Sequence, residues 1–349
     1  MKINLRKEMF TEKEFVLAES GAMRATAFRY STGVEALKIE NKKGYIIVLP
    51  FQGQGVWDIC FGGRSLKMKT TVKEPVANVS YLETYGGFLY HCGVGNIGAP
   101  DASHPHHGEI PNKAYGEAHL MVDTDEKGTF MALGGALDLD IAFVRKYQFR
   151  PECRLYEDAS VLNVHVELEN KRADAMEYAY LCHINFIPMD GAKIIDNATM
   201  KTVHKAIPDS FTDAQKADLG GYMDRLEADR SVGDTVGAPG QFYKPEICCT
   251  MIYDGARGKT MQYVEGEGAC FVDHDAEALP YTIRWISRTE TEDSMGMALP
   301  ATCEHLGYDY AKANGQMKSL GGFETLKFDI VAGWIDDAEA KKVKEELGK

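Results

Sequence analysis

Hydrophobic and polar residues alternate with a period of two in several stretches of the chain. Within residues 161–170, VLNVHVELEN, every second side chain from 162 to 168 is aliphatic, and those at 163, 165, 167 and 169 are polar. Residues 324–334, ETLKFDIVAGW, repeat the pattern with Leu326, Phe328 and Ile330 on one side. Because successive side chains of a strand point to opposite faces, this pattern predicts strands with one buried face.

Other short apolar runs recur along the chain between clusters of Gly, Pro, Asp and Asn, whereas helical periodicity is scarce. The best helix candidate covers about 336–348, DDAEAKKVKEELG, and a lesser one lies within 212–230. Many short strands with few helices favour an antiparallel sandwich or barrel. No low-complexity linker divides the chain, so we expect a single all-β domain over residues 1–349 with a few short helices.

The charge pattern narrows the range of partners. The formal net charge is −13, the acidic residues are spread along the chain, and Lys and Arg form no cluster with aromatic residues. We therefore expect neither nucleic acid nor a membrane as a partner. No apolar run is long enough to cross a bilayer, and no secretory signal opens the sequence. These features predict a cytoplasmic protein with a small-molecule ligand, for which a homodimer is one assembly to test.

The cysteines give no sign of a disulfide framework. Most of the eight stand singly in apolar or glycine-rich surroundings, Cys248 and Cys249 are adjacent, and no CxxC motif occurs. This pattern predicts reduced, mostly buried thiols and no zinc ribbon.

Imidazoles are concentrated in HPHHGEIPN, residues 104–112, which contains His104, His106, His107 and Glu109. The surrounding segment is rich in glycine, which is typical of loops that approach a ligand closely. A solvated surface turn, a ligand-binding loop and a metal site all remain open. A metal would need three converging ligands, and in an extended segment the adjacent His106 and His107 would point apart.

A second candidate is His183 in the predicted strand YAYLCHINFIP, where Asn185 occupies the next position on the same face. A histidine there is either a satisfied core residue or a group that projects into a cleft. An imidazole with a pKa of about 6.5 can give or take a proton at neutral pH, and we favour the functional interpretation.

A third segment, MGMALPATCEHLGYDY (295–310), follows the end of a predicted strand with polar residues. Together the three segments resemble the aldose 1-epimerase (galactose mutarotase-like) superfamily, especially a bacterial epimerase-like branch. In mutarotases an HG element comes first, a strand with a catalytic His lies mid-chain, and a Glu-bearing strand lies near the C-terminus. The resemblance to the branch covers most of the chain, including VLPFQGQGVWDICFGGRSLKMK and YLETYGGFLYHCG.

This resemblance implies a β-supersandwich of two antiparallel layers that binds a monosaccharide in an open cleft. It also implies interconversion of sugar anomers by acid–base ring opening, for which we expect neither a cofactor nor a metal. By resemblance, His183 is the general acid and His107 is a hydrogen-bonding partner of the sugar ring. Glu109, Asn112 and Asn185 are implied contacts of sugar hydroxyls.

The sequence departs from mutarotases at the general base. By motif matching, Leu299 stands where the mutarotase glutamate is expected, and leucine cannot accept a proton. The nearest titratable replacements are Glu304 and His305, with Glu109 as a third. We predict Glu304 as the base and His305 as a substrate contact.

Residues upstream could complete a sugar site. Trp57 offers a stacking face, and Gln52, Asp58 and Glu83 carry groups that can hydrogen-bond to hydroxyls, although each also has a structural explanation. The absence of a concentrated Arg/Lys motif favours neutral sugars over phosphorylated ones. Two alternatives stay open: a non-catalytic carbohydrate-binding protein, which Leu299 favours, and a metal-dependent sugar isomerase or lyase, which the His/Glu cluster favours.

Overall fold

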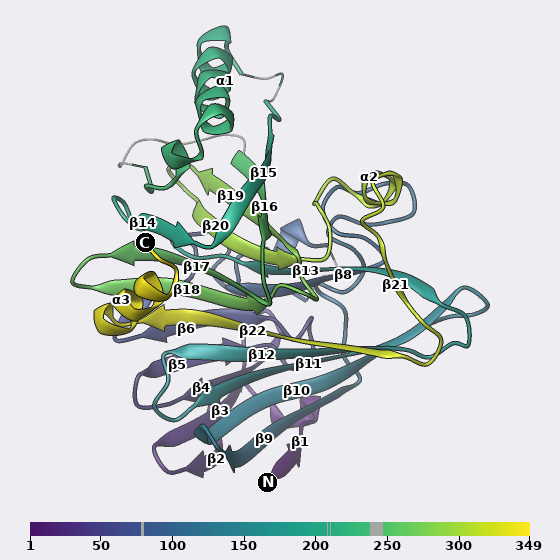
Figure 1. Ribbon diagram of the computed structural model, residues 1–349. Coiled ribbons are helices and arrows are strands. Elements are labelled where there is room, and N and C mark those ends of the chain that lie inside the picture. Colours follow the sequence, from purple (N-terminus) through teal and green to yellow (C-terminus); the bar gives the residue numbers. More distant parts are fainter. Residues whose placement is uncertain (78–79, 208, 210, 238–246) are drawn as a thin grey trace.

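Two antiparallel β-sheets form the body of the protein in the computed structural model, which describes residues 1–349 apart from 78–79, 208, 210 and 238–246 (Figure 1). In this part of the chain, the nine-stranded sheet has the order β1 (Lys2–Asn4), β9 (Glu117–Asp125), β10 (Gly128–Ile141), β11 (Arg145–Tyr156), β12 (Val161–Asn170), β22 (Thr325–Ile335), β18 (Gly268–Asp275), β17 (Arg257–Val264) and β14 (Lys193–Asp196).

The thirteen-stranded sheet carries the strands that matter for the site. Its described strands run in the order β15 (Ala198–His204), β16 (Ile247–Tyr253), β19 (Tyr281–Arg288), β20 (Asp293–Ala301), β13 (Met176–Ile184), β8 (Leu89–Val94), β6 (Val56–Phe61), β5 (Gly44–Val48), β4 (Glu35–Glu40), β3 (Met23–Arg29) and β2 (Phe15–Ser20), with β21 (Lys318–Leu320) paired to β13 and β7 (Arg64–Ser65) paired to β6. The prediction of an all-β sandwich is confirmed.

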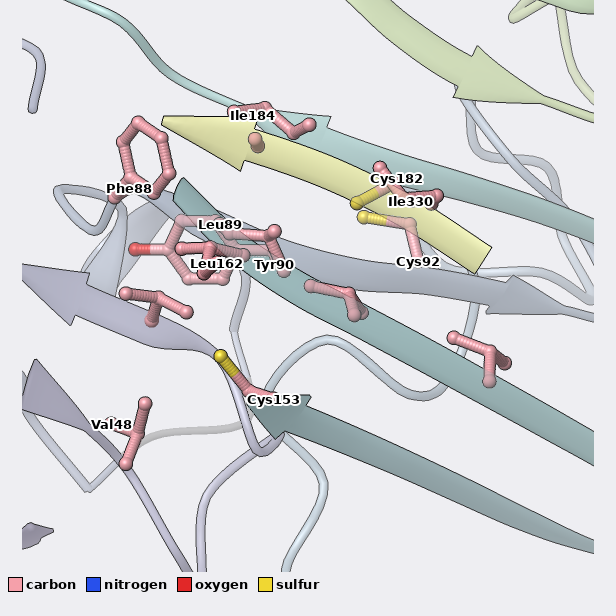
Figure 2. Packing of buried hydrophobic residues seen from close by; sticks show 14 of the residues in the cluster. Val48, Phe88, Leu89, Tyr90, Cys92, Cys153, Leu162, Cys182, Ile184 and Ile330 are labelled. Atoms are coloured by element: carbon pink, nitrogen blue, oxygen red, sulfur yellow. The ribbon is translucent and has the colours of Figure 1, made fainter. Parts of the chain in front are cut away.

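The main hydrophobic core lies between the two sheets. On β12, Leu162, Val164 and Val166 are fully buried and lie opposite Ala332, Ile330 and Phe328 of β22 in the strand register. Figure 2 shows Leu162 and Ile330 of the nine-stranded sheet beside Leu89, Cys92 and Cys182 of the other sheet. The period-two pattern of residues 161–170 is therefore confirmed, because its apolar face is the one that meets the second layer.

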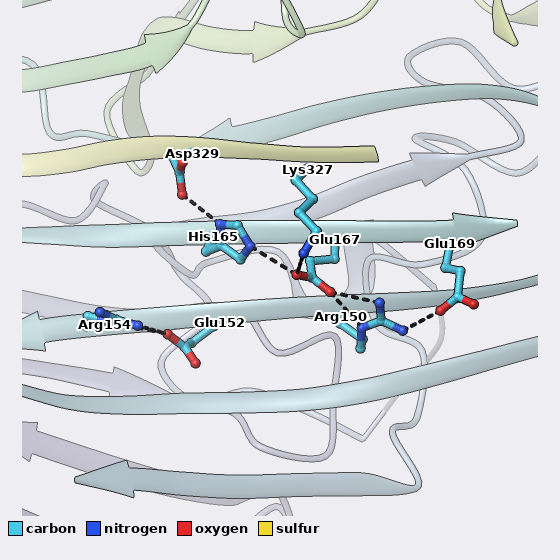
Figure 3. A network of polar contacts seen from close by, with 8 residues as sticks. All are labelled: Arg150, Glu152, Arg154, His165, Glu167, Glu169, Lys327 and Asp329. Atoms are coloured by element: carbon cyan, nitrogen blue, oxygen red, sulfur yellow. Dashed lines mark hydrogen bonds and ion pairs between the residues drawn. The ribbon is translucent and has the colours of Figure 1, made fainter. Parts of the chain in front are cut away.

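The opposite face of β12 carries a network of ion pairs (Figure 3). Glu167 accepts hydrogen bonds from Arg150 at 2.8 Å and from Lys327 at 2.5 Å, and His165 pairs with Asp329 at 2.7 Å. Side chains of alternating charge keep this outer face wet and leave the inner face for the core.

The described helices are α1 (Asp213–Ala228), α2 (Tyr308–Ala313) and α3 (Asp337–Glu346), with 3₁₀ turns η1 (Lys7–Met9), η2 (Leu82–Thr84) and η3 (Arg230–Gly233). Of the helices, α1 contacts the edge strand β15, and α3 packs against β17 and β18. Thr212 closes a capping box with Gln215 at the start of α1, and Asp336 caps α3. Both helices lie inside the predicted ranges, whereas the organisation of the chain as a single domain stays a prediction.

Two further sequence expectations bear on the molecule as a whole. All eight cysteines lie in the described part of the chain, and all are free thiols. Among the described residues, no helix combines the length and apolar character needed to span a membrane.

Candidate active site

A cavity of about 330 Å³ opens over the thirteen-stranded sheet, and this volume lies in the range of roughly 300–1,000 Å³ that is usual for ligand pockets. Four neighbouring strands, β16, β19, β20 and β13, supply its floor, which consists of Leu181, His183, Cys248, Ile283, Trp285 and Leu299. Side chains alternate along β13, so Cys182 and Ile184 enter the core while Leu181 and His183 face the cavity.

Loop residues form the walls, and three of these are the histidines His106, His107 and His305. The rings of His107 and His183 lie 5.1 Å apart between their centroids, at an interplanar angle of 81°. The two histidines that the sequence singled out, some seventy-five residues apart in the chain, therefore meet at one cavity.

Backbone geometry presents His107 to the cavity. His107 has a φ of 60° and Gly108 a φ of 80°. A Cβ on Gly108 would lie 2.2 Å from the carbonyl oxygen of Gly93, so only glycine fits this turn. His106 also lines the cavity, contrary to the expectation that adjacent histidines would point apart, because the segment is turned rather than extended. His104 instead pairs with Asp101 at the surface.

Asn185 fixes the orientation of the His183 ring through a hydrogen bond at Nδ1. His183 Nδ1 lies 2.9 Å from Asn185 Oδ1, and Asn185 Nδ2 donates to the carbonyl of Gly87 at 3.0 Å. Tyr85 donates its hydroxyl to the same Oδ1 at 2.8 Å. Since Oδ1 can only accept, His183 donates from Nδ1 when neutral, and its Nε2 keeps a free lone pair.

The opposite tautomer is favoured at His107. The backbone N–H of Gly98 donates to His107 Nδ1 at 3.1 Å, so Nδ1 is an acceptor and the ring proton resides on Nε2. Within the described residues, no hydrogen bond engages Nε2 of either ring. The cavity thus receives one imidazole with a basic Nε2 and one with an Nε2–H donor.

Burial keeps both rings neutral. It lowers the pKa of His183 to about 3, and this effect outweighs the hydrogen bond to Asn185, which favours the charged form. The pKa of His107 also lies well below its ordinary value, first because of burial and then because of the neighbouring histidines, including His183. Both imidazoles are therefore neutral at physiological pH.

Glu304, the predicted base, lies outside the cavity lining. Its side chain is fully buried, and its Oε2 accepts hydrogen bonds from Lys201 and Gln316 at 2.6 Å each. Burial would raise the pKa of Glu304, but these two donors outweigh it and lower the pKa. His305 lines the cavity and packs its ring 4.6 Å from that of His204. Burial lowers the pKa of His305 to about 4.

Leu299 occupies the cavity floor with a fully buried side chain, beside Ile283 in the strand register. In the part of the chain that the structure describes, none of the residues lining the cavity is a carboxylate. The resemblance places the mutarotase base at Leu299, and the titratable groups that line the cavity with it include the imidazoles of His106, His107, His183 and His305.

Two predicted contacts lie just outside the cavity. Glu109 accepts a hydrogen bond from Tyr147 at 2.8 Å and lines an adjoining hollow. Asn112 is buried and donates to the carbonyl of Ser80 at 3.4 Å. Asn185 acts through His183 rather than from the lining itself.

The four upstream candidates lie apart from the cavity lining. Trp57 is buried in a separate apolar cluster, and Gln52 donates to the carbonyl of Val76 at 3.0 Å. Asp58 accepts a hydrogen bond from Tyr45 at 3.2 Å, and Glu83 is an exposed residue of η2. Their predicted contact with a sugar has no support from these positions.

Three aromatic residues that line the cavity, Tyr81, Tyr85 and Trp285, were not predicted from the sequence. Tyr81 and Tyr85 belong to the segment YLETYGGF, whose glycines hinted at a ligand loop, and Tyr81 lies 4.9 Å from His107 between ring centroids. Trp285 lies 5.4 Å from His183 between ring centroids, but the pattern of its strand YTIRWISR is that of an ordinary core strand. Trp285 lies at the site because of the tertiary packing, which the local sequence does not reveal.

The histidines do not form an evident metal centre. Among the described residues, no group of three or more His, Cys, Asp or Glu side chains is arranged to hold a metal ion.

Comparison with solved structures identifies the fold. The two layers match galactose mutarotase-like structures: a Klebsiella pneumoniae protein described as a "putative aldose 1-epimerase" superposes with a TM-score of 0.78 at 17% identity, covering 96% of this chain and 91% of that one. A galactose mutarotase-like protein from Clostridium acetobutylicum gives 0.59 at 12% identity, covering 90% and 99%. A galactose mutarotase related enzyme from Lactobacillus acidophilus gives 0.54 at 11% identity, covering 86% and 98%.

The fold is therefore that of the galactose mutarotase-like proteins. Within it, the chain belongs to the family described as Domain of unknown function (DUF4432), whose model matches residues 31–332. A comparison of the sequence with curated proteins finds no match.

Proposed function

We propose that this protein is a carbohydrate-active enzyme of the aldose 1-epimerase type, which interconverts the anomers of a monosaccharide. One observation carries the proposal: His107 and His183 meet at one cavity as neutral rings with complementary Nε2 atoms. The likeness of the fold to the structures described above supports the same class of reaction.

In the proposed reaction, the proton of the anomeric hydroxyl moves to Nε2 of His183 while the bond between C1 and the ring oxygen breaks. As that bond breaks, Nε2–H of His107 passes its proton to the ring oxygen, so the open-chain sugar is a neutral hydroxyaldehyde; His183 carries the extra proton and His107 lacks its Nε2 proton until the ring closes again. Rotation about the C1–C2 bond exposes the other carbonyl face, and the same steps in reverse close the ring. His183 is thus the base in this proposal, rather than the acid that the resemblance implies.

The proposal leaves Glu304 out of the proton transfers. Its carboxylate is bonded to Lys201 and Gln316 and lies away from the cavity lining, so a structural role suits it better. Tyr81 and Trp285 supply the aromatic surface against which the apolar face of a sugar can pack.

Exchange between anomers can be measured by NMR saturation transfer across a panel of aldoses. We expect the wild-type protein to accelerate exchange of at least one sugar, and His183→Ala to lower that rate by about 100-fold or more. His165→Ala is the matched control, because His165 lies on the outer face of the nine-stranded sheet. If no sugar exchanges faster than in buffer, the enzymatic proposal is wrong.

A non-catalytic sugar-binding protein is the second candidate, and Leu299 favours it because an aliphatic side chain occupies the expected position of the base. Calorimetric titration would then show saturable sugar binding without exchange, and the binding would survive His183→Ala.

A further inference from the structure

A second hollow, of about 440 Å³, adjoins the cavity, and Tyr81, Leu82 and His106 line both. The remaining lining of the second hollow includes Glu109 and Lys113. A ligand seated against His107 can therefore extend past His106 without leaving the protein surface.

The segment 104–112 is the ridge between the two hollows. His107 lines only the first cavity, Glu109 lines only the second hollow, and His106 lines both. The two spaces differ in chemistry, because the described lining of the first contains imidazoles, phenols and apolar side chains, whereas the second contains a carboxylate and an ammonium group.

Glu109 is held in place by hydrogen bonds, and its carboxylate can still accept further ones. Its carboxylate accepts hydrogen bonds from the hydroxyl of Tyr147 at 2.8 Å and from the backbone N–H of Gly95 at 3.0 Å, and it pairs with Arg145 at 3.4 Å. These donors come from β11 and from the loop after β8, so they hold the side chain rigidly. The side chain keeps 20% of its surface exposed, and two carboxylate oxygens offer about four acceptor positions, so capacity for further donors remains.

Lys113 supplies the complementary donor. It is exposed, and no ion pair or side-chain hydrogen bond engages its ammonium group among the residues that the structure describes. A hydroxyl group can donate to Glu109 and accept from Lys113, which makes a hydroxyl-rich ligand suitable here. An anionic group such as a phosphate would meet the charge of Glu109, so a neutral ligand is favoured.

We propose that the second hollow binds a second, neutral sugar unit, so that the preferred ligand is a reducing disaccharide or longer saccharide rather than a free monosaccharide. The reducing unit lies in the first cavity with its anomeric carbon near His107 and His183, and this placement rests on the proposed function. The next unit crosses over His106 and hydrogen-bonds to Glu109 and Lys113. A fixed acceptor gives affinity without an ordering cost, because its partners already hold it in position.

The test compares the affinity for reducing disaccharides (lactose, maltose and cellobiose) with that for glucose and galactose, by calorimetry on the full chain. We expect at least one disaccharide to bind more tightly than its component monosaccharides. Glu109→Gln and Lys113→Ala should each lower that preference by about fivefold or more, the effect of losing one hydrogen bond. Lys13→Ala, at an exposed lysine outside both hollows, is the matched control.

The outcomes separate the two proposals. Monosaccharides that bind as tightly as every disaccharide, or a preference that survives both substitutions, would overturn the second subsite and leave the proposed function standing. If neither class binds, the proposed function fails, and the second subsite fails with it. Lys113→Ala keeps the test decisive if Glu109→Gln disturbs the contacts with Tyr147 and Arg145, since Lys113 is exposed.

Discussion

His107 and His183 face the same cavity as opposite tautomers, because their Nδ1 atoms have different hydrogen-bond partners. Asn185 Oδ1 accepts a hydrogen bond from Nδ1–H of His183, whereas the backbone N–H of Gly98 donates to Nδ1 of His107. Burial then removes the positive charge from both rings. The residue type and its position along the chain do not define such a role, because the hydrogen bond at Nδ1 determines whether Nε2 acts as an acceptor or as a donor.

The low pKa of His183 predicts that its contribution to the exchange rate varies little with pH near neutrality. With a pKa of about 3, His183 stays neutral, so its contribution to the exchange rate should be constant between about pH 5 and pH 8. Asn185→Asp places a negative charge beside Nδ1, stabilises the imidazolium and raises the pKa of His183. The rate should then fall as the pH drops through the raised pKa. NMR titration of the ring measures the shift, and Asn163→Asp on the outer face of β12 should leave it unchanged. An unshifted titration in Asn185→Asp would contradict the assigned hydrogen bond.

At the scale of elements, the site depends on how two loops meet. Gly98 and Leu306 form an isolated bridge between the loop after β8 and the loop after β20, and the carbonyl of His305 accepts the N–H of Ala99 at 3.0 Å. Gly98 also orients His107 through its N–H. The first loop thus carries His107, the second carries His305, and their junction sets the distance between the walls of the cavity.

Gly98→Ala tests this junction. Gly98 has a φ of 75°, and a Cβ there would lie 1.7 Å from the carbonyl oxygen of His305, so the loops must separate. We expect the free energy of unfolding to fall by more than about 1 kcal/mol in urea denaturation, together with a loss of sugar affinity. Gly116→Ala is the matched control, because a Cβ on Gly116 meets no atom within 4 Å, and its effect should stay within about 0.5 kcal/mol. Equal effects of the two substitutions would contradict the proposed role of the junction.

At the scale of the whole molecule, the two faces of β12 contribute unequally to stability. The inner face packs into the core between the sheets, while the outer face belongs to the ion-pair network of Figure 3. Burial of aliphatic surface is the main favourable contribution, whereas ion pairs that reach solvent add little.

We therefore expect Leu162→Ala to lower the free energy of unfolding by about 2–5 kcal/mol, because Leu162 is fully buried and its removal leaves a cavity. Glu167→Gln removes a carboxylate that contacts Arg150 and Lys327, and should lower it by about 1 kcal/mol or less. Chemical denaturation of both variants measures the difference. A larger loss from Glu167→Gln would show that the outer network, rather than the core, dominates.

The layered β architecture, the inward face of β12 and the helix at 337–346 could be predicted from the sequence, because these depend on residue periodicity and capping within a few neighbouring positions. The sequence also singled out His107 and His183, because polar imidazoles in a glycine-rich loop and in an apolar strand stand out from their surroundings.

Which side chains share the cavity could not be predicted in this way, because it depends on how distant segments pack. The order of strands brings Leu299 and Trp285 beneath His183, a backbone turn brings His106 and His107 to the same side, and the packing around Lys201 takes Glu304 away from the lining. The positions of these side chains depend on contacts between segments far apart in the chain, and a local pattern of hydrophobic and polar residues does not predict such contacts.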